Sequence, residues 1–366
     1  MILPRASAAL SSRLFSTAAR HNALTSRFFH YSPLKAAVAH PITAHGPPPK
    51  APAPTPEFGG RAEEQPAKDT EPGSEAPKRP SKPSVALKKR FWKNVDVTRK
   101  PEGEYQVMLD SRPVRTPTKD VLFIPSTKPH LAHAIALEWD VMTSAQQALK
   151  THLIPLTSIT ARAADVVRED AEGETTTRNQ IITTAMRYLE TDTLLCWVPE
   201  KDTYTPEETN ENGENAESLR DAQMRVARDI MAFLSTKVWP GVEIKPILDE
   251  NSIMPVSQPQ ATKDIIKSWV SGLEAYDIAA LERGILASKS LLVAVRLVAE
   301  WSENFRHLQR PEQRKFGIEE AAEASSLEVT WQTDMWGEVE DTHDVDKEDL
   351  KRQLGSVVVL VSGEKR

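Results

Sequence analysis

Nine of the thirteen residues in KSLLVAVRLVAEW, residues 289–301, are apolar. When this stretch is placed on a helix of about 3.6 residues per turn, its apolar side chains lie on nearly every side. A helix without a continuous polar face has to be covered by other elements. We therefore expect residues 289–301 to form the buried centre of a helical bundle.

The segments before this helix have the one-sided apolar pattern of helices that cover a core. Residues 264–273 and 275–287 lead directly into it, and the segment 219–238 stops before Pro240, which cannot continue a helix. The expected inward residues are Ile181 or Ile182, Ala185 and Leu189 in the segment 178–197, and Val226, Ile230 and Phe233 in the segment 219–238.

The pattern after the central helix predicts one more long helix, from about Ile318 to Leu350. SVVVLV, residues 356–361, is rich in β-branched residues and predicts a possible short strand. The Glu- and Asn-rich residues 200–218 indicate an exposed insertion. We thus expect a mainly α-helical C-terminal domain over 173–352, followed by a tail or short strand over 353–366.

A different pattern precedes the helices. Between residues 91 and 125, short β-branched and aromatic stretches alternate with turn residues, which predicts a meander of about four strands. From Ser126, a candidate N-cap, a helical period follows and should cover one face of this sheet. The fold class is therefore α+β, with a small N-terminal β-meander and helix domain over 87–172. The expected inward stripe of its helix is Leu131, Ile135, Trp139 and Met142.

The first 56 residues contain six Lys or Arg and no Asp or Glu. An acid-free N-terminus rich in Arg and Ser is typical of a mitochondrial transit peptide, which we predict over 1–46 with processing near 29–35. The alternative is an ordinary basic tail. Residues 47–86 are rich in proline and poor in large apolar residues, so we expect a disordered linker there. These features predict a protein of the mitochondrial matrix, free or peripheral to the inner membrane.

Charge and composition exclude several classes of function. Without the first 56 residues the formal net charge changes from −6 to −12, which argues against a nucleic-acid partner. No apolar run reaches the length of a membrane span, so we expect no stable membrane insertion. The single cysteine, Cys196, excludes an intramolecular disulfide. The glycine-rich phosphate loops of nucleotide-binding proteins are missing, and we expect no cofactor.

WGEVEDTHD, residues 336–344, is the one stretch that resembles a catalytic or metal-binding cluster. Glu340 and His343 form a Glu-x-x-His pair, which is the unit that four-helix di-metal proteins use. Such a centre needs a second pair, and the sequence contains none. The count of ligands therefore argues against a metal site.

The same stretch can be placed on the last expected helix. Glu338, Asp341 and Asp344 then follow one another at a spacing of three residues, and neighbouring like charges repel. Such a face is either solvated or a docking surface for a cationic partner. The apolar stripe of this helix is expected at Leu327, Trp331, and Met335 or Trp336.

The order of several blocks resembles a known family. The blocks are KRFWKNVDV, LDSRPVRTP, LAHAIALEWD, IPLTSITARAADV, RYLETDTLLC, LASKSLLVAVRL and WGEVEDTHD. Over roughly residues 88–350 the chain resembles the mitochondrial F(1)-type ATP synthase assembly factor 2 family, whose members chaperone the free alpha subunit. The resemblance implies an N-terminal α+β domain and a helical domain, with no catalysis and no use of ATP.

The resemblance also implies a partner and candidate residues. The chaperone, monomeric when free, would bind the unassembled F(1) alpha subunit and shield the surface that the beta subunit later covers. Glu338, Glu340 and Asp341 match the acidic block of the family and are the candidates for contacts with basic groups of the alpha subunit. Trp336 and Glu138 match the family pattern beside the acidic block and in the first domain.

Two other functions stay open from the residues alone. One is a metal- or carboxylate-dependent enzyme in a helical bundle, using Glu340 and His343. The other is a structural subunit that stays in a finished complex.

Overall fold

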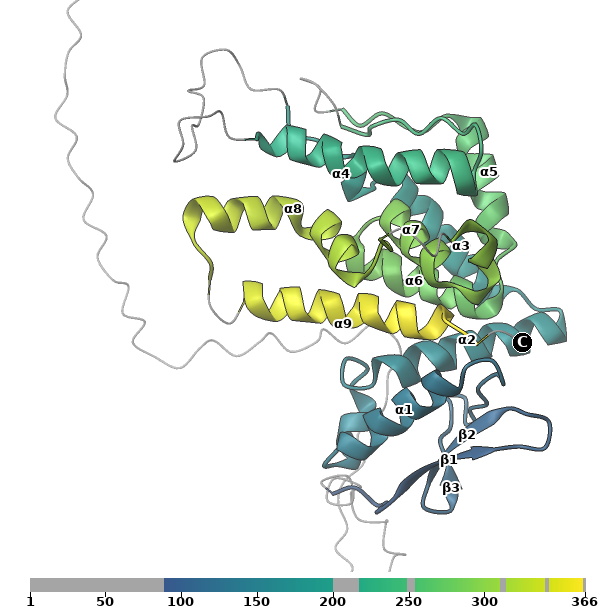
Figure 1. The fold of residues 1–366 in the computed structure, drawn as a ribbon. Coiled ribbons are helices and arrows are strands. Elements are labelled where there is room, and N and C mark those ends of the chain that lie inside the picture. The colour runs from purple at the N-terminus through teal and green to yellow at the C-terminus, as the bar shows by residue number, and fades with distance from the viewer. Residues whose placement is uncertain (1–88, 200–216, 249–253, 310–313, 340–341, 365–366) are drawn as a thin grey trace, which may run out of the picture. The chain divides into compact units, whose positions relative to one another are not determined.

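The computed structural model describes residues 89–199, 217–248, 254–309, 314–339 and 342–364 (Figure 1). The transit peptide expected over 1–46, the linker expected over 47–86 and nearly all of the expected insertion lie outside these residues. In the described ranges the elements are β1 (Val95–Arg99), β2 (Tyr105–Leu109), β3 (Arg112–Pro113), α1 (Pro129–Val141), η1 (Ala145–Leu149), α2 (Pro155–Glu172), α3 (Thr176–Leu189), η2 (Thr193–Leu195), α4 (Leu219–Phe233), η3 (Leu234–Val238), α5 (Gln260–Ser271), α6 (Ala275–Ser288), α7 (Leu291–Trp301), η4 (Glu303–Leu308), α8 (Ile318–Trp336) and α9 (His343–Val361).

The N-terminal sheet has three antiparallel strands in the order β1-β2-β3, with Val97 opposite Val107. Helix α1 packs against β1 and β2. The expected fourth strand is wrong, because residues 121–124 form only isolated bridges to Arg115 and Tyr105. Pro125, directly after this segment, has no N–H group to donate, which limits extension of the pairing.

Helix α1 begins at Pro129, so Ser126 is not its N-cap. Proline at the first helical position disfavours helical geometry in the residue before it, and Lys128 has φ −122° and ψ 51°. The inward stripe expected for this helix is buried, except that Trp139 stays half-buried.

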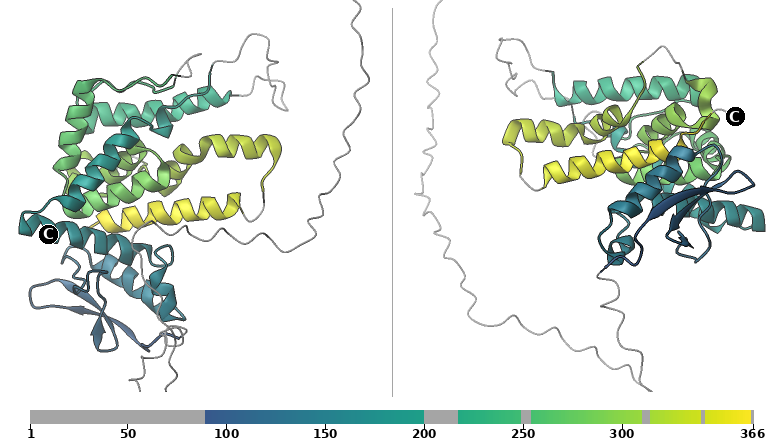
Figure 2. Two further views of the ribbon diagram at one scale, coloured as in Figure 1. Left: turned by 180° about the vertical axis from the view of Figure 1, so that it is seen from behind. Right: turned by 60° about the horizontal axis from the view of Figure 1, so that its bottom comes forward.

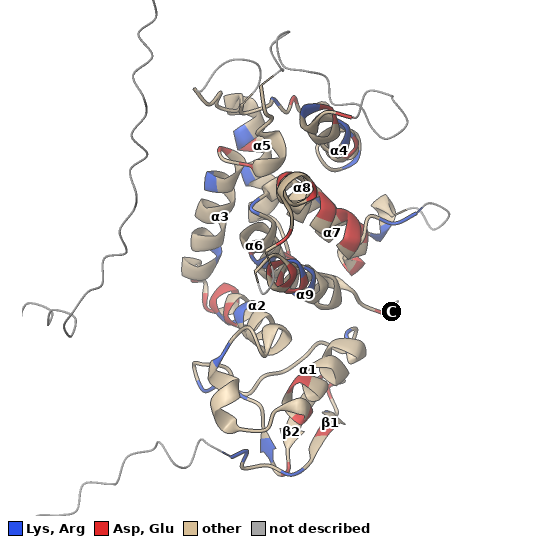
Figure 3. Cartoon of the chain, turned by 90° about the vertical axis from the view of Figure 1, so that its left-hand side faces the viewer, with Lys and Arg blue, Asp and Glu red and all other residues tan. Residues whose placement is uncertain are grey.

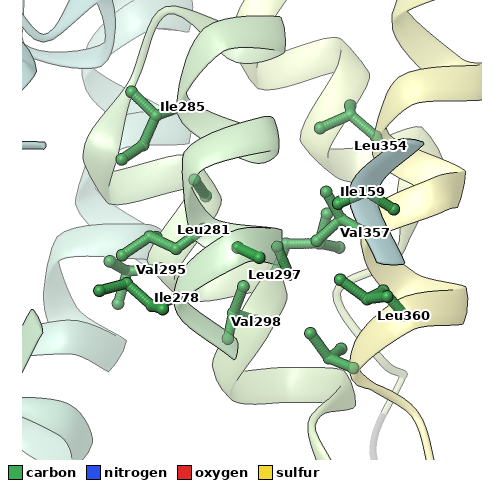
Figure 4. Close-up of a cluster of buried hydrophobic side chains, with 14 of the residues drawn as sticks. Ile159, Ile278, Leu281, Ile285, Val295, Leu297, Val298, Leu354, Val357 and Leu360 are labelled. Carbon is green, nitrogen blue, oxygen red and sulfur yellow. The ribbon is translucent and has the colours of Figure 1, made fainter. Parts of the chain in front are cut away.

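Helix α7 is the centre of the helical part. Every apolar side chain from Leu291 to Ala299 is fully buried, which confirms the expectation for this stretch. Figure 4 shows side chains of α6, α7 and α9 meeting there. A Cβ atom at Gly284 of α6 would lie 3.0 Å from the Cβ of Ala294, so glycine permits the close approach of α6 and α7. Burial of each Leu or Val in this cluster stabilises the fold by about 1.5–3 kcal/mol.

The single last helix expected from Ile318 to Leu350 is wrong, because the chain forms two helices. Gly337 has φ +89°, a conformation that other residues rarely adopt, and it ends α8. Helix α9 then returns alongside α8, which both views of Figure 2 show.

The short strand expected over 356–361 is also wrong, because these residues continue α9. Leu354, Val357 and Val361 recur at helical spacing and are fully buried. Their contacts with the bundle override the strand preference of β-branched residues.

The α+β fold class is confirmed by the small sheet and the helices that follow it. Helix α2 ends at Glu172, where we expected a domain boundary, but α2 also packs against α6 and α9. The described residues belong to one compact unit, and the boundary at this position stays a prediction. Among the described helices, none is long and apolar enough to cross a membrane.

Candidate functional site

The base of the α8–α9 pair is fixed to the rest of the protein by a buried charge. Lys128, whose side chain is 3% exposed, pairs with Glu303 at 2.8 Å. Its Nζ also donates to the carbonyl oxygens of Val361 (3.2 Å) and Ser362 (2.9 Å), at the end of α9. Burial lowers the pKa of Lys128, and the hydrogen bond to Glu303 opposes this shift. The end of α9 is thereby anchored to the start of α1.

The opposite end of the α8–α9 pair is not packed into the core. We define the distal hairpin as residues 323–339 and 342–353, which comprise the outer parts of α8 and α9 with their described connection. No residue of the distal hairpin is buried. By contrast, Ala321 and Ala322 just before it, and Leu354 just after it, pack into the core.

Large apolar side chains are exposed on the distal hairpin. Trp336 is 79% exposed, and Met335, beside it, is 49% exposed. The expectation that Met335 or Trp336 faces the protein interior is therefore wrong, because α8 extends beyond the helices that could cover them. The exposed large apolar residues of the distal hairpin are Val329, Met335, Trp336, Val339 and Val345.

The turn between the two helices is closed by His343. The Val339 N–H donates to Nδ1 of His343 at 3.1 Å, and the His343 N–H donates to the Val339 carbonyl at 3.2 Å. Nδ1 is thus an acceptor for the backbone, and as such is not free to bind a metal. Among the described residues, no group of three or more His, Cys, Asp or Glu side chains could hold a metal ion. Glu340, the expected partner of His343 in the metal hypothesis, lies outside the described residues.

The distal hairpin is strongly acidic. Residues 319–346 contain ten Asp or Glu and no Lys or Arg. Two cations of α9 form ion pairs: Lys351 pairs with Glu319 of α8, and Arg352 pairs with Asp349 of α9 itself. Neither acid lies in the connection between α8 and α9. Figure 3 marks these charges on α8 and α9, which are labelled there. Residues 338–346 themselves contain no Lys or Arg, and the next cation along the chain is Lys347 of α9.

The structure corrects the helical spacing that we expected for these acids. Glu338 lies after Gly337, outside α8, and is exposed. The three-residue spacing from Glu338 through Asp341 to Asp344 is not realised on one helix, because the chain turns here. Glu340 and Asp341 lie outside the described residues, so their place at the turn follows from sequence alone.

Glu138, the remaining candidate, contacts the start of α2 and not the distal hairpin. Its carboxylate accepts hydrogen bonds from the N–H groups of Leu156 (2.7 Å) and Thr157 (2.8 Å), at the start of α2. Burial raises the pKa of Glu138, while these hydrogen bonds act in the opposite direction. Both carboxylate oxygens satisfy the first N–H groups of a helix, so we do not include Glu138 in the candidate surface.

One buried acid was not singled out from the sequence. Asp192 is fully buried and accepts hydrogen bonds from the N–H groups of Leu194 and Leu292, both at 3.0 Å. It therefore caps the start of α7. Burial raises its pKa to about 6, against the effect of its hydrogen bonds. Nothing in the local sequence of Asp192 indicates that its partner is a helix about a hundred residues later.

Comparison with known families gives one match over a large part of the described chain. Residues 89–235 match the family described as ATP12 chaperone protein. The "Protein atp12, mitochondrial" of Schizosaccharomyces pombe is 31% identical over 272 residues, which cover 74% of this chain and 81% of that protein. The "Protein ATP12, mitochondrial" of Saccharomyces cerevisiae is 28% identical over 287 residues, which cover 74% and 83%.

Solved structures share the fold. Atp12 from Paracoccus denitrificans superposes with a TM-score of 0.51 at 20% identity, covering 74% of this chain and 96% of that one. The Atu1473 protein from Agrobacterium tumefaciens gives a TM-score of 0.52 at 19% identity, with coverages of 75% and 85%. At this level of identity the likeness concerns the fold alone.

Proposed function

Because this chain belongs to the ATP12 chaperone family, we propose that it assists assembly of the F(1) sector of mitochondrial ATP synthase by binding the unassembled alpha subunit through the distal hairpin. Both relatives named above are mitochondrial, and so is this protein. In the proposal it acts in the matrix, shields the beta-facing surface of the alpha subunit and does not hydrolyse ATP.

The observation that carries this proposal is the absence of any buried residue in the distal hairpin. A pair of helices without a fully buried residue gains little stability from its own packing, because most helix stability comes from burial of an apolar face. Exposed apolar side chains such as Trp336 and Val339 indicate a surface that another protein covers. An unassembled ring subunit has a large apolar interface that needs such temporary cover.

The chemistry of the surface limits the partner. Trp336 at the centre of an interface would supply much of the binding energy, as buried tryptophans commonly do. The surrounding acids, with Glu338 described and Glu340 and Asp341 placed by sequence, require basic groups on the partner. Charge contacts at the rim of an interface increase the rate of association more than its strength. Such a surface can bind early and be exchanged when the beta subunit arrives.

Charge reversal tests the proposal. We expect Glu338→Lys combined with Glu340→Lys to weaken binding of purified alpha subunit about tenfold or more in titration calorimetry at low salt. The matched control is Asp96→Lys combined with Glu102→Lys, which reverses two exposed acids of the N-terminal sheet and its first turn. The control should bind like the unmodified protein.

Three results would contradict parts of the proposal. Equal binding by the hairpin variant and its control would remove the hairpin from the interface. Failure of the unmodified protein to bind alpha subunit, with capture of another F(1) subunit instead, would contradict the named partner. Recovery of the protein in finished ATP synthase would favour the alternative of a permanent subunit.

A further inference from the structure

A groove of about 480 Å³ in the N-terminal part has no place in the function proposed above. Three of the blocks that carry the family resemblance meet there. Phe91 and Trp92 come from KRFWKNVDV, Arg112 and Val114 from LDSRPVRTP, and Trp139 from the helix α1 block. Its volume is in the range of sites that hold a small ligand or a short peptide segment.

The floor of this groove is apolar and fixed in place. Trp92 and Val114 are almost fully buried, and the ring of Trp92 meets that of Trp139 edge to face at 5.4 Å. The indole N–H of Trp92 donates to the Trp139 carbonyl at 3.2 Å, and the indole N–H of Trp139 donates to Oγ1 of Thr157 at 3.0 Å. Because both indole donors are already used within the protein, the groove offers its occupant aromatic surface without an unpaired polar group.

The rim of the groove is positively charged. The guanidinium of Arg112 lies 5.7 Å from the centre of the Phe91 ring, and Phe91 is 58% exposed. Arg115 donates to the Lys119 carbonyl at 2.6 Å. No Asp or Glu lines the groove. This is notable because the chain beyond residue 56 has a net charge of −12.

We propose that this groove binds a short polypeptide segment of the client protein in which an aromatic or aliphatic side chain is followed by carboxylates. The apolar side chain packs on Phe91 and Trp139, and the carboxylates bind Arg112. The proposal goes beyond the hairpin and does not depend on which protein the client is. The groove would bind an acidic segment, whereas the distal hairpin would bind basic groups.

The test uses the full-length chain and two synthetic Gly/Ser peptides of about ten residues. One carries a phenylalanine followed by two aspartates, and the other has two lysines in place of the aspartates. Binding is followed through the indole N–H resonances of Trp92 and Trp139 in NMR spectra. We expect the acidic peptide to shift both resonances and to bind about tenfold more tightly than the basic one, because an Arg–carboxylate hydrogen bond is charge-assisted.

Three variants separate binding in the groove from general electrostatic attraction. Arg112→Glu should lose the preference for the acidic peptide. Arg99→Glu is the matched control, because Arg99 is also exposed and lies at the same 5.7 Å from a ring, that of Tyr105, but does not line the groove. Ser111→Trp, at the exposed rim, should block both peptides by filling the groove.

The proposal is overturned if neither peptide shifts the indole resonances, if both peptides bind equally, or if Arg99→Glu has the same effect as Arg112→Glu. Sedimentation that shows a dimer abolished by Ser111→Trp would also overturn it, because the occupant would then be a second copy of this chain. None of these results bears on the hairpin, so failure here and failure of the proposed function are distinguishable.

Discussion

Helix α7 and the distal hairpin both carry large apolar side chains, yet those of α7 are completely buried and several of those on the distal hairpin are exposed. From Leu291 to Ala299 the apolar side chains of α7 are fully buried, whereas Trp336 is 79% exposed. The difference lies in what surrounds the helix and not in the residue types. An apolar stripe shows that a helix must be covered, and only the structure shows whether the same chain provides the cover.

The largest effect on stability is expected in the core, because the side chains of α7 are fully buried and those of the distal hairpin are not. Leu297→Ala removes a fully buried side chain and leaves a cavity between α6, α7 and α9. We expect the free energy of unfolding to fall by about 2–5 kcal/mol, measured by urea denaturation. Leu327→Ala, a half-buried residue of the distal hairpin, is the matched control and should cost much less. Similar losses for the two would mean that the hairpin is packed like the core.

The second effect concerns the cap of α7 and depends on pH. The pKa of Asp192 is raised from 3.8 to about 6 in the folded protein, so the folded form holds a proton that the unfolded form has released. The free energy of unfolding should therefore fall as the pH rises from about 4 to 6, by up to about 3 kcal/mol. Above that window the loss is complete.

Asp192→Asn should remove this dependence, so that the unmodified protein gains stability over the variant as the pH is lowered. Asp229→Asn, an exposed acid on α4, serves as the control and should keep the pH profile of the unmodified protein. Parallel profiles for the Asp192 variant and the unmodified protein would show that the folded carboxyl group does not titrate in this range.

A smaller effect is expected at Glu138, which caps α2. Glu138→Ala leaves the N–H groups of Leu156 and Thr157 without their acceptor. The expected loss is about 0.5–2 kcal/mol in thermal or urea unfolding, as for other lost helix caps. Glu138→Gln keeps one acceptor oxygen and should lose less. Unchanged stability together with weaker client binding would return Glu138 to the interaction surface.

The smallest effect on stability is expected at the distal hairpin. Trp336→Ala should change the free energy of unfolding by less than about 0.5 kcal/mol, because the side chain contacts little of its own protein. Binding of alpha subunit, in contrast, should weaken by about 2 kcal/mol or more if Trp336 is the centre of the interface. Val329→Ala, at another exposed apolar site of α8, should weaken binding less. A clear drop in melting temperature for Trp336→Ala would show that this tryptophan has a structural role.

The sequence predicts the parts of this fold that depend on short-range periodicity. The buried character of α7 and the inward residues Ile181, Ala185 and Leu189 follow from their spacing, and the structure confirms them. The break at Gly337 was missed because a helix tolerates a single glycine, and its left-handed backbone conformation is decided by the return of α9. SVVVLV was misassigned because local strand preference is weaker than packing against a core.

Contacts between distant segments leave no local pattern in a sequence. Lys128 comes before α1, Glu303 begins η4 and Val361 ends α9, and nothing near any of them identifies the others. Of the three candidate acids, the structure describes only Glu338, which is exposed, so the docking role of the acidic block stays a prediction. The end of α8 at Gly337 and the exposure of Trp336 required the structure, because they depend on how α9 returns along the bundle.

The contact of Lys128 with Val361 joins residues that are 233 positions apart. A polypeptide that enters an organelle from its N-terminus delivers α1 long before α9, so Lys128 has no buried partner while delivery is under way. Contacts between such distant residues also form slowly, because the intervening loop has to close first. The assembly factor should therefore complete its own fold only after α9 has arrived. Until then, the incomplete chain should itself depend on general chaperones.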